Sequence, residues 1–175
     1  MNKQIFWIAS YPKSGNTLLR SILSSIFFTN DGLFNFSLLK NIPIIESTIN
    51  LDFIKKNHPK DYINIHKLEI LSKYWDAIQS RENLGFNSDF LFVKTHHALS
   101  KAFNNSFTSE LCTRGIIYIV RDPRSIVKSY ANHNQMTVES ASDRMLEYGS
   151  TLGGIKNSVN EADEIIPEET TISPS

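Results

Sequence analysis

The chain has almost no cysteine and lacks both a long hydrophobic run and a net charge, and each of these absences narrows the possibilities. Cys112 is the single cysteine among 175 residues, which excludes an internal disulfide, and no Cys/His spacing indicates a metal site. No apolar run reaches the length of a membrane span, and Lys13 follows the N-terminus too closely for a secretory signal. We therefore expect a cytoplasmic protein with no metal and no membrane partner.

The formal charge of zero conceals an uneven distribution along the chain. Residues 161–175 hold five acidic residues and no Lys or Arg, so residues 1–160 hold 18 basic and 13 acidic residues, a net charge of +5. This moderate excess suits an anionic small molecule and is too weak to indicate nucleic acid. The length suits one domain with a real core, which we expect over 1–160. Residues 161–175 are expected to form a disordered acidic tail or, alternatively, a packed surface segment. The oligomeric state stays open.

Apolar runs alternate with helical patterns along the chain, which is typical of an α/β fold. The runs at 4–9, 89–94 and 115–120 predict parallel strands, and their nearly continuous apolar character predicts central strands covered on both faces. The helices that we expect lie at 17–28, 61–80, 137–148 and from Pro123 onward, where Asp122 suits the N-cap and proline the first helical position.

Residues 9–18 form the most informative segment and read Ala-Ser-Tyr-Pro-Lys-Ser-Gly-Asn-Thr-Leu. A strand that breaks at Pro12 and Gly15 and continues as a helix leaves backbone N–H groups unpaired, and the helix dipole favours an anion there. One positive charge and three side-chain donors lie in the same segment: Lys13, Ser14, Asn16 and Thr17. The segment therefore predicts a phosphate or sulfate site, and the alternative is an ordinary strand–turn–helix junction.

A second motif, Lys94-Thr95-His96-His97, follows the second expected strand. Ligands in parallel sheets bind beyond the carboxyl ends of the strands. A histidine in that place can act as a general base, because its pKa lies near neutrality. The alternative is a pair of polar loop residues.

A third motif runs from Ile117 to Tyr130 and contains Arg121-Asp122-Pro123. Arg121 closes the third expected strand, and Ser129 follows eight residues later, in the second turn of the next helix. That spacing lets the serine hydroxyl point toward the strand end, where an arginine and a hydroxyl would bind a phosphate monoester. The alternative is a helix cap with solvated charges.

In order and spacing, these three motifs resemble those of the sulfotransferases that use the cofactor 3′-phosphoadenosine 5′-phosphosulfate (PAPS). The resemblance covers roughly residues 4 to 160 and implies a P-loop-like parallel sheet flanked by helices, with sulfuryl transfer to a hydroxyl or amine of a small-molecule acceptor. It implies catalytic roles for three residues, His96 as the base and Lys13 and Lys94 as cations that neutralise the departing phosphate. The cofactor-binding residues that it implies are Lys13, Ser14, Gly15, Asn16, Thr17, Leu18, Arg121 and Ser129.

The sequence departs from the family pattern in three places. Leu18 stands where members often carry a tryptophan that stacks on adenine, and His97-Ala98 replaces the more usual Leu-Pro, so His97 stays an alternative base. The Gly-rich basic segment that completes the 3′-phosphate site in longer members is not found, so we expect a C-terminally truncated domain. Two other functions stay open: a non-catalytic phosphoadenosine-binding module, and a P-loop nucleotide-binding protein of other chemistry. The P-loop alternative is disfavoured, because this sequence contains no Gly-Lys-Ser/Thr motif and no strand-ending aspartate suited to Mg²⁺.

Overall fold

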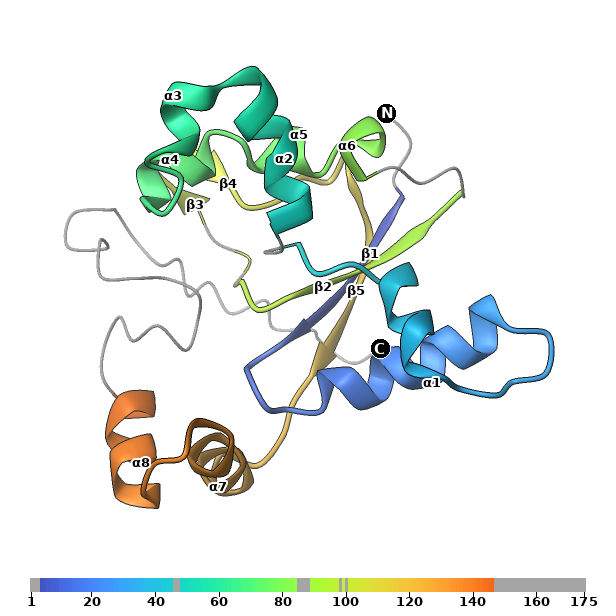
Figure 1. The fold of residues 1–175 in the computed structure, drawn as a ribbon, viewed down its shortest axis with the longest axis vertical. Coiled ribbons are helices and arrows are strands. Elements are labelled where there is room, and N and C mark those ends of the chain that lie inside the picture. Colours follow the sequence, from blue (N-terminus) through green and yellow to red (C-terminus); the bar gives the residue numbers. More distant parts are fainter. Residues whose placement is uncertain (1–3, 46–47, 85–88, 98, 100, 147–175) are drawn as a thin grey trace, which may run out of the picture.

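The computed structural model describes residues 4–45, 48–84, 89–97, 99 and 101–146. The acidic segment 161–175 lies outside the described residues, as does the end of the helix expected over 137–148. Within the described ranges a parallel sheet lies between helices, which confirms the predicted α/β fold (Figure 1). None of the helices in these ranges is both long enough and apolar enough to span a bilayer.

The sheet of the described chain has three parallel strands, β1 (Ile5–Ser10), β2 (Leu91–Thr95) and β5 (Thr113–Ile119), in the order β2-β1-β5. Ala9 pairs with Thr95, and Ser10 pairs with Ile119, so the three strands end at one edge of the sheet. The loops that follow them therefore meet there.

The position of β5 differs from the prediction that all three strands would be central and covered. Among the described residues β5 is an edge strand, and Ile116 and Tyr118 are 49% and 67% exposed. Its apolar run alone could not show this, because a continuous apolar strand reveals its hydrophobicity and not its neighbours. Of the three described strands β1 alone is central; β2 is the other edge strand, although it is buried along its whole length and Lys94 forms an isolated parallel bridge with Ile44.

The remaining elements surround this sheet. They are α1 (Asn16–Phe28), η1 (Phe36–Asn41), α2 (Thr48–Asn57), α3 (Pro59–Tyr62), α4 (Leu68–Ser72), α5 (Trp75–Ile78), α6 (Arg81–Leu84), β3 (Lys101–Ala102), β4 (Asn105–Ser106), α7 (Pro123–Asn134) and α8 (Val138–Leu146). We call α2–α6 together with the β3–β4 hairpin the helical cap.

The single helix predicted over 61–80 is wrong, because the chain there forms α4, α5 and the end of α3. Between α3 and α4 the backbone bonds close tight turns, with the N–H of Asn64 donating to Asp61 and that of Lys67 donating to Asn64. These three-residue steps turn the chain, yet leave the apolar side chains facing the core. The helical spacing of apolar residues was therefore real, but it did not require a continuous helix.

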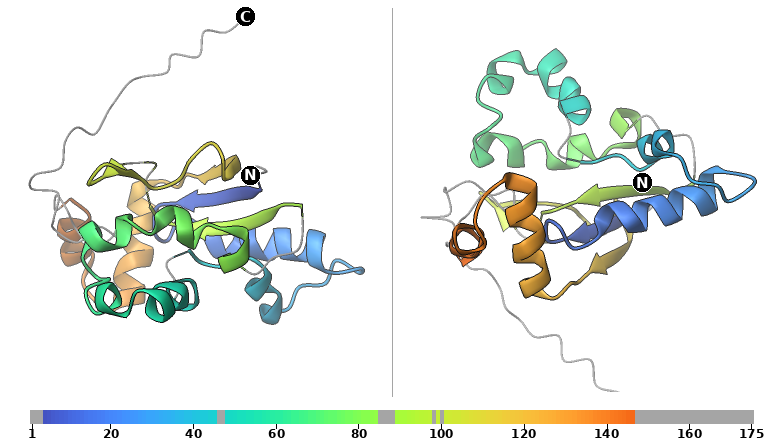
Figure 2. Two further views of the ribbon diagram at one scale, coloured as in Figure 1. Left: turned by 90° about the horizontal axis from the view of Figure 1, so that it is seen from above. Right: turned by 60° about the horizontal axis from the view of Figure 1, so that its bottom comes forward.

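The two faces of the sheet carry different layers, which Figure 2 shows in two further views. Ile5 and Trp7 of β1 belong to the larger core, together with residues of the helical cap such as Trp75. The alternate residues Phe6 and Ile8 belong to a smaller cluster that includes Leu19 of α1. This alternation follows from the two-residue period of a strand.

The start of α7 agrees with the sequence prediction. The Asp122 carboxylate accepts a hydrogen bond from the backbone N–H of Arg124 at 2.9 Å, and Pro123 occupies the first turn. The Arg124 guanidinium lies 2.7 Å from the same carboxylate, and its hydrogen bonds lower the pKa of Asp122. This cap fixes where α7 leaves the sheet, and so where its side chains point.

Candidate active site

A cavity of about 740 Å³ opens where the strands end, and we call it the strand-end cavity. Its wall comes from the loop after β1, the start of α1, the ends of β2 and β5, and one face of α7. The lining residues are Pro12, Lys13, Gly15, Asn16, Thr17, Arg20, Ile44, Lys94, His96, Arg121, Ser129, Tyr130, His133 and Asn134. Segments that are far apart in sequence thus share one concave surface.

The loop between β1 and α1 is shaped by two residues with positive φ. Lys13 has φ 67° and Gly15 has φ 110°, and the N–H of Ser14 donates to the Tyr11 carbonyl at 3.2 Å. A Cβ on Gly15 would meet nothing within 4 Å, so its backbone conformation, and not its space, calls for glycine. As the N-cap of α1, Gly15 has no side chain to accept from the first-turn amides, which leaves them to an external anion.

Three buried polar atoms beside this loop have no hydrogen-bond partner: Ser14 Oγ, Asn16 Oδ1 and Arg20 Nε. Unsatisfied buried groups are rare, and each calls for an explanation such as a missing ligand contact. Asn16 uses its amide nitrogen inside the protein, where it lies 3.3 Å from the Ile8 carbonyl oxygen and 3.2 Å from Ser10 Oγ. The side-chain amide nitrogen of Asn16 is therefore occupied within the protein. The backbone N–H of Asn16, at the start of α1, is the group that an anion would meet.

Arg20 lines the cavity, and no sequence motif predicted it there. It is 8% exposed, and its Nη2 donates to the carbonyl oxygens of Leu39 and Ile42 at 2.9 and 2.7 Å. These bonds hold η1 against α1, and burial lowers the pKa of the guanidinium from its ordinary value. One feature of the sequence could have identified Arg20: it is the single charged residue of α1, one turn after Asn16.

The charged side chains that line the cavity are all cationic. Lys13, Arg20, Lys94 and Arg121 all line it, and none of the described lining residues is acidic. Lys94 is only 9% exposed, because it lies near the end of a strand that is buried along its whole length. Cations gathered in a concave, partly desolvated surface attract a polyanion much more strongly than scattered surface charges do.

The two adjacent histidines face different regions. His96 lines the cavity, and its Nδ1 lies 2.6 Å from the Ser10 carbonyl oxygen. The His97 ring packs in the cap core, with ring centroids 4.8 Å from Phe107 and 6.0 Å from Trp75. Of the two histidines between which the sequence left a choice, His96 is therefore the one that a cavity ligand could meet.

Arg121 and Ser129, predicted to share one site, do line the same cavity. The Nη1 of Arg121 donates to the Lys13 carbonyl at 3.0 Å, which ties the end of β5 to the loop after β1. Tyr130, His133 and Asn134 extend the same face of α7 and were not predicted, although His133 follows Ser129 by one helical turn.

Two predicted cofactor contacts do not reach the wall. Leu18 is 67% exposed on α1 and does not line the cavity. Ser14 is buried in the loop, and its backbone N–H closes the turn with Tyr11.

No group of three His, Cys, Asp or Glu residues that could hold a metal ion occurs in the described ranges.

Comparison with known proteins gives one match. A family model of the sulfotransferase domain matches residues 3–164, a range that contains all three motifs and every described element. No curated protein and no solved structure matches the chain.

Proposed function

Because the chain belongs to the sulfotransferase family, we propose that it transfers a sulfuryl group from PAPS to a hydroxyl or amine of a small-molecule acceptor. The observation that carries this proposal is the strand-end cavity, where an anion loop, four cationic side chains and His96 lie on one wall. We also propose a cytoplasmic location, which suits a chain whose single cysteine is Cys112.

The residues present fit the two anionic ends of PAPS. We assign the 5′-phosphosulfate to the loop of Lys13 to Thr17, where first-turn amides and a lysine converge. The 3′-phosphate is assigned to Arg121 and Ser129, which offer a guanidinium and a hydroxyl. The unpartnered Nε of Arg20, a cation that lines the cavity, supports an anionic occupant.

The bound donor would supply an activated sulfuryl group whose S–O bond to the 5′-phosphate breaks as a new bond to the acceptor oxygen or nitrogen forms. In this scheme His96 takes the proton that the acceptor loses. Lys13 and Lys94 stabilise the negative charge that grows on the departing phosphate, which is the larger electrostatic contribution. Arg121 and Ser129 hold the remote phosphate, so that binding energy far from the reacting atoms orients the donor.

Two measurements test the proposal. Calorimetric titration with 3′-phosphoadenosine 5′-phosphate (PAP) should show binding that is clearly tighter than that of AMP, which lacks the 3′-phosphate. Transfer from PAPS to a panel of phenols, alcohols and amines, with 4-nitrophenol as the first probe, should proceed equally well with EDTA and with Mg²⁺.

The outcomes separate the alternatives. PAP binding without transfer to any acceptor would identify a phosphoadenosine-binding module. Equal affinity for PAP and AMP, or activity that requires Mg²⁺, would favour a P-loop protein of other chemistry.

A further inference from the structure

The hydrogen bond between His96 and Ser10 fixes which ring nitrogen carries the hydrogen. His96 Nδ1 lies 2.6 Å from the main-chain carbonyl oxygen of Ser10 and 3.5 Å from the hydroxyl oxygen of the Ser10 side chain. A carbonyl oxygen can only accept, so Nδ1 must donate, and in the neutral ring the lone pair then resides on Nε2. The last residue of β1 therefore determines the tautomer of the proposed base.

Asn16 in turn holds that last residue of β1. Its amide nitrogen lies 3.2 Å from Ser10 Oγ and 3.3 Å from the Ile8 carbonyl oxygen. Ser10 is 4% exposed and Asn16 is 8% exposed, so little water competes for these bonds. Because Asn16 is the first residue of α1, the start of the anion-loop helix is joined to the strand end that orients His96.

We propose that Asn16 is a positioning residue, which through Ser10 keeps His96 in the Nδ1–H tautomer with Nε2 as the basic nitrogen. The proposal rests on the function above in taking His96 as the base. It gives Asn16 a role other than the phosphate contact expected from the sequence, since its amide is engaged with β1. The chain of contacts joins the donor loop to the base by two hydrogen bonds and one strand residue.

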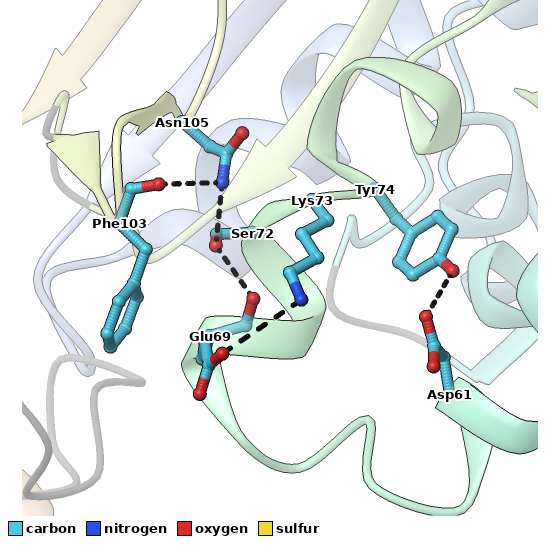
Figure 3. A network of polar contacts seen from close by, with 7 residues as sticks. All are labelled: Asp61, Glu69, Ser72, Lys73, Tyr74, Phe103 and Asn105. Atoms are coloured by element: carbon cyan, nitrogen blue, oxygen red, sulfur yellow. Dashed lines mark hydrogen bonds and ion pairs between the residues drawn. The ribbon is translucent and has the colours of Figure 1, made fainter.

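The chain contains a matched control for this arrangement. In the helical cap the amide nitrogen of Asn105 also serves one serine hydroxyl and one backbone carbonyl, Ser72 Oγ at 3.2 Å and Phe103 O at 3.1 Å (Figure 3). Ser72 is 2% exposed and so is buried as Ser10 is. Neither Asn105 nor Ser72 lines the strand-end cavity. Asn105→Ala therefore removes the same kinds of hydrogen bond without touching the route to His96.

The test uses the full chain with ¹⁵N-labelled histidine, and NMR reports the tautomer of the neutral His96 ring; His96→Gln assigns its signals. The wild-type protein should show a protonated Nδ1 and an unprotonated Nε2. Asn16→Ala and Ser10→Ala each keep the Ser10 carbonyl but remove the bond between Asn16 and the Ser10 hydroxyl that holds it, so each should shift the ring toward a mixture of tautomers, and the double variant should add little to either. Asn105→Ala should leave the spectrum unchanged.

Kinetics supply the second measurement. Ser10→Ala keeps the carbonyl that accepts from Nδ1 but removes the hydroxyl through which Asn16 holds that carbonyl in place, so kcat should fall by up to about tenfold, while PAP affinity by calorimetry stays within about twofold. An Nε2–H tautomer in the wild-type protein would overturn the proposal, as would Asn16→Ala and Ser10→Ala spectra that both match the wild type. The NMR result does not depend on PAP binding or turnover, so failure of the sulfotransferase assignment would be seen separately, in the PAP titration.

Discussion

The strand-end cavity and the helical cap use polar groups in opposite ways. Around the cavity, Ser14 Oγ, Asn16 Oδ1 and Arg20 Nε are buried and unpartnered, and of the four such atoms found among the described residues, one alone, Gln79 Oε1, belongs to the cap. In the cap, the Tyr74 hydroxyl donates to Asp61 at 2.6 Å, and Asn105 donates to Ser72 at 3.2 Å (Figure 3).

This contrast separates residues that serve a ligand from residues that serve the fold. Unsatisfied buried polar atoms cost free energy in the absence of a partner, so their grouping beside one cavity indicates a functional surface. Closed hydrogen bonds around a hydrophobic core stabilise the protein itself. We therefore expect substitutions at the cavity to change turnover or binding, and substitutions in the cap to change unfolding.

The sharpest test of the contrast is the pair of adjacent histidines. His96→Ala should abolish detectable transfer, because His96 is the proposed general base, while PAP affinity stays nearly intact. His97→Ala should leave transfer largely unchanged and should lower the melting temperature, since its ring packs on Phe107 in the cap. An inactive His97→Ala protein together with an active His96→Ala protein would contradict the assignment, because His97 would then be the base.

Lys13 should show the next largest effect. Lys13→Ala removes the cation of the loop after β1, and the transfer rate should fall on the order of 10²–10³-fold, as for loss of one preorganised charge-stabilising donor. Lys73→Ala is the control, because Lys73 lies in the cap and forms an exposed pair with Glu69 at 4.0 Å, which contributes little. Equal rates for Lys13→Ala and the wild type in a timed transfer assay would remove Lys13 from the mechanism.

Arg121 should have a smaller effect that depends on the ligand. A charge-assisted hydrogen bond contributes roughly 1.5–3 kcal/mol to the free energy of binding. Arg121→Ala, which removes one, should therefore weaken PAP binding about tenfold or more. The loss should be confined to nucleotides with a 3′-phosphate. Calorimetry with PAP and with adenosine 5′-phosphosulfate makes the comparison, and Arg124→Ala, whose guanidinium is engaged by Asp122, is the control. Equal weakening for both nucleotides would show that Arg121 acts elsewhere.

The smallest effect concerns the cap alone. Tyr74→Phe removes the hydrogen bond to Asp61 and should lower the free energy of unfolding by about 1 kcal/mol, or the melting temperature by roughly 2–4 °C, without changing transfer.

The same bond raises the pKa of Tyr74 from 10.0 to about 12. Its stabilisation is thus complete below the unfolded pKa and is lost as the pH rises from about 10 to about 12. Ultraviolet titration of tyrosinate should show that Tyr74→Phe removes a group that titrates near pH 12. Loss of a group that titrates near pH 10, with the late part of the curve unchanged, would contradict this.

The sequence predicted the parts of the site that depend on local chemistry. Gly15, with its positive φ at the start of α1, and Asp122, as the cap of α7, follow from the residues themselves and their neighbours. Arg20 and His133 could not be predicted in this way, because their place on the wall depends on which helix face turns toward the strand ends. The break-up of the segment 61–80 was hidden for a similar reason, since turns and helix bury the same apolar residues.

The pairing of β2 with β1 has a consequence for chemistry as well as for folding. Side chains alternate along β2, so Lys94 and His96 reach the cavity while Val93 and His97 turn toward the cap. A slip of one residue between the strands would exchange the two histidines and would force the Phe92 ring into the space that Val93 fills. The difference in size between Phe92 and Val93 therefore favours the register that places His96, and not His97, at the cavity, so a core substitution could change which imidazole lines the cavity without altering any residue of the site.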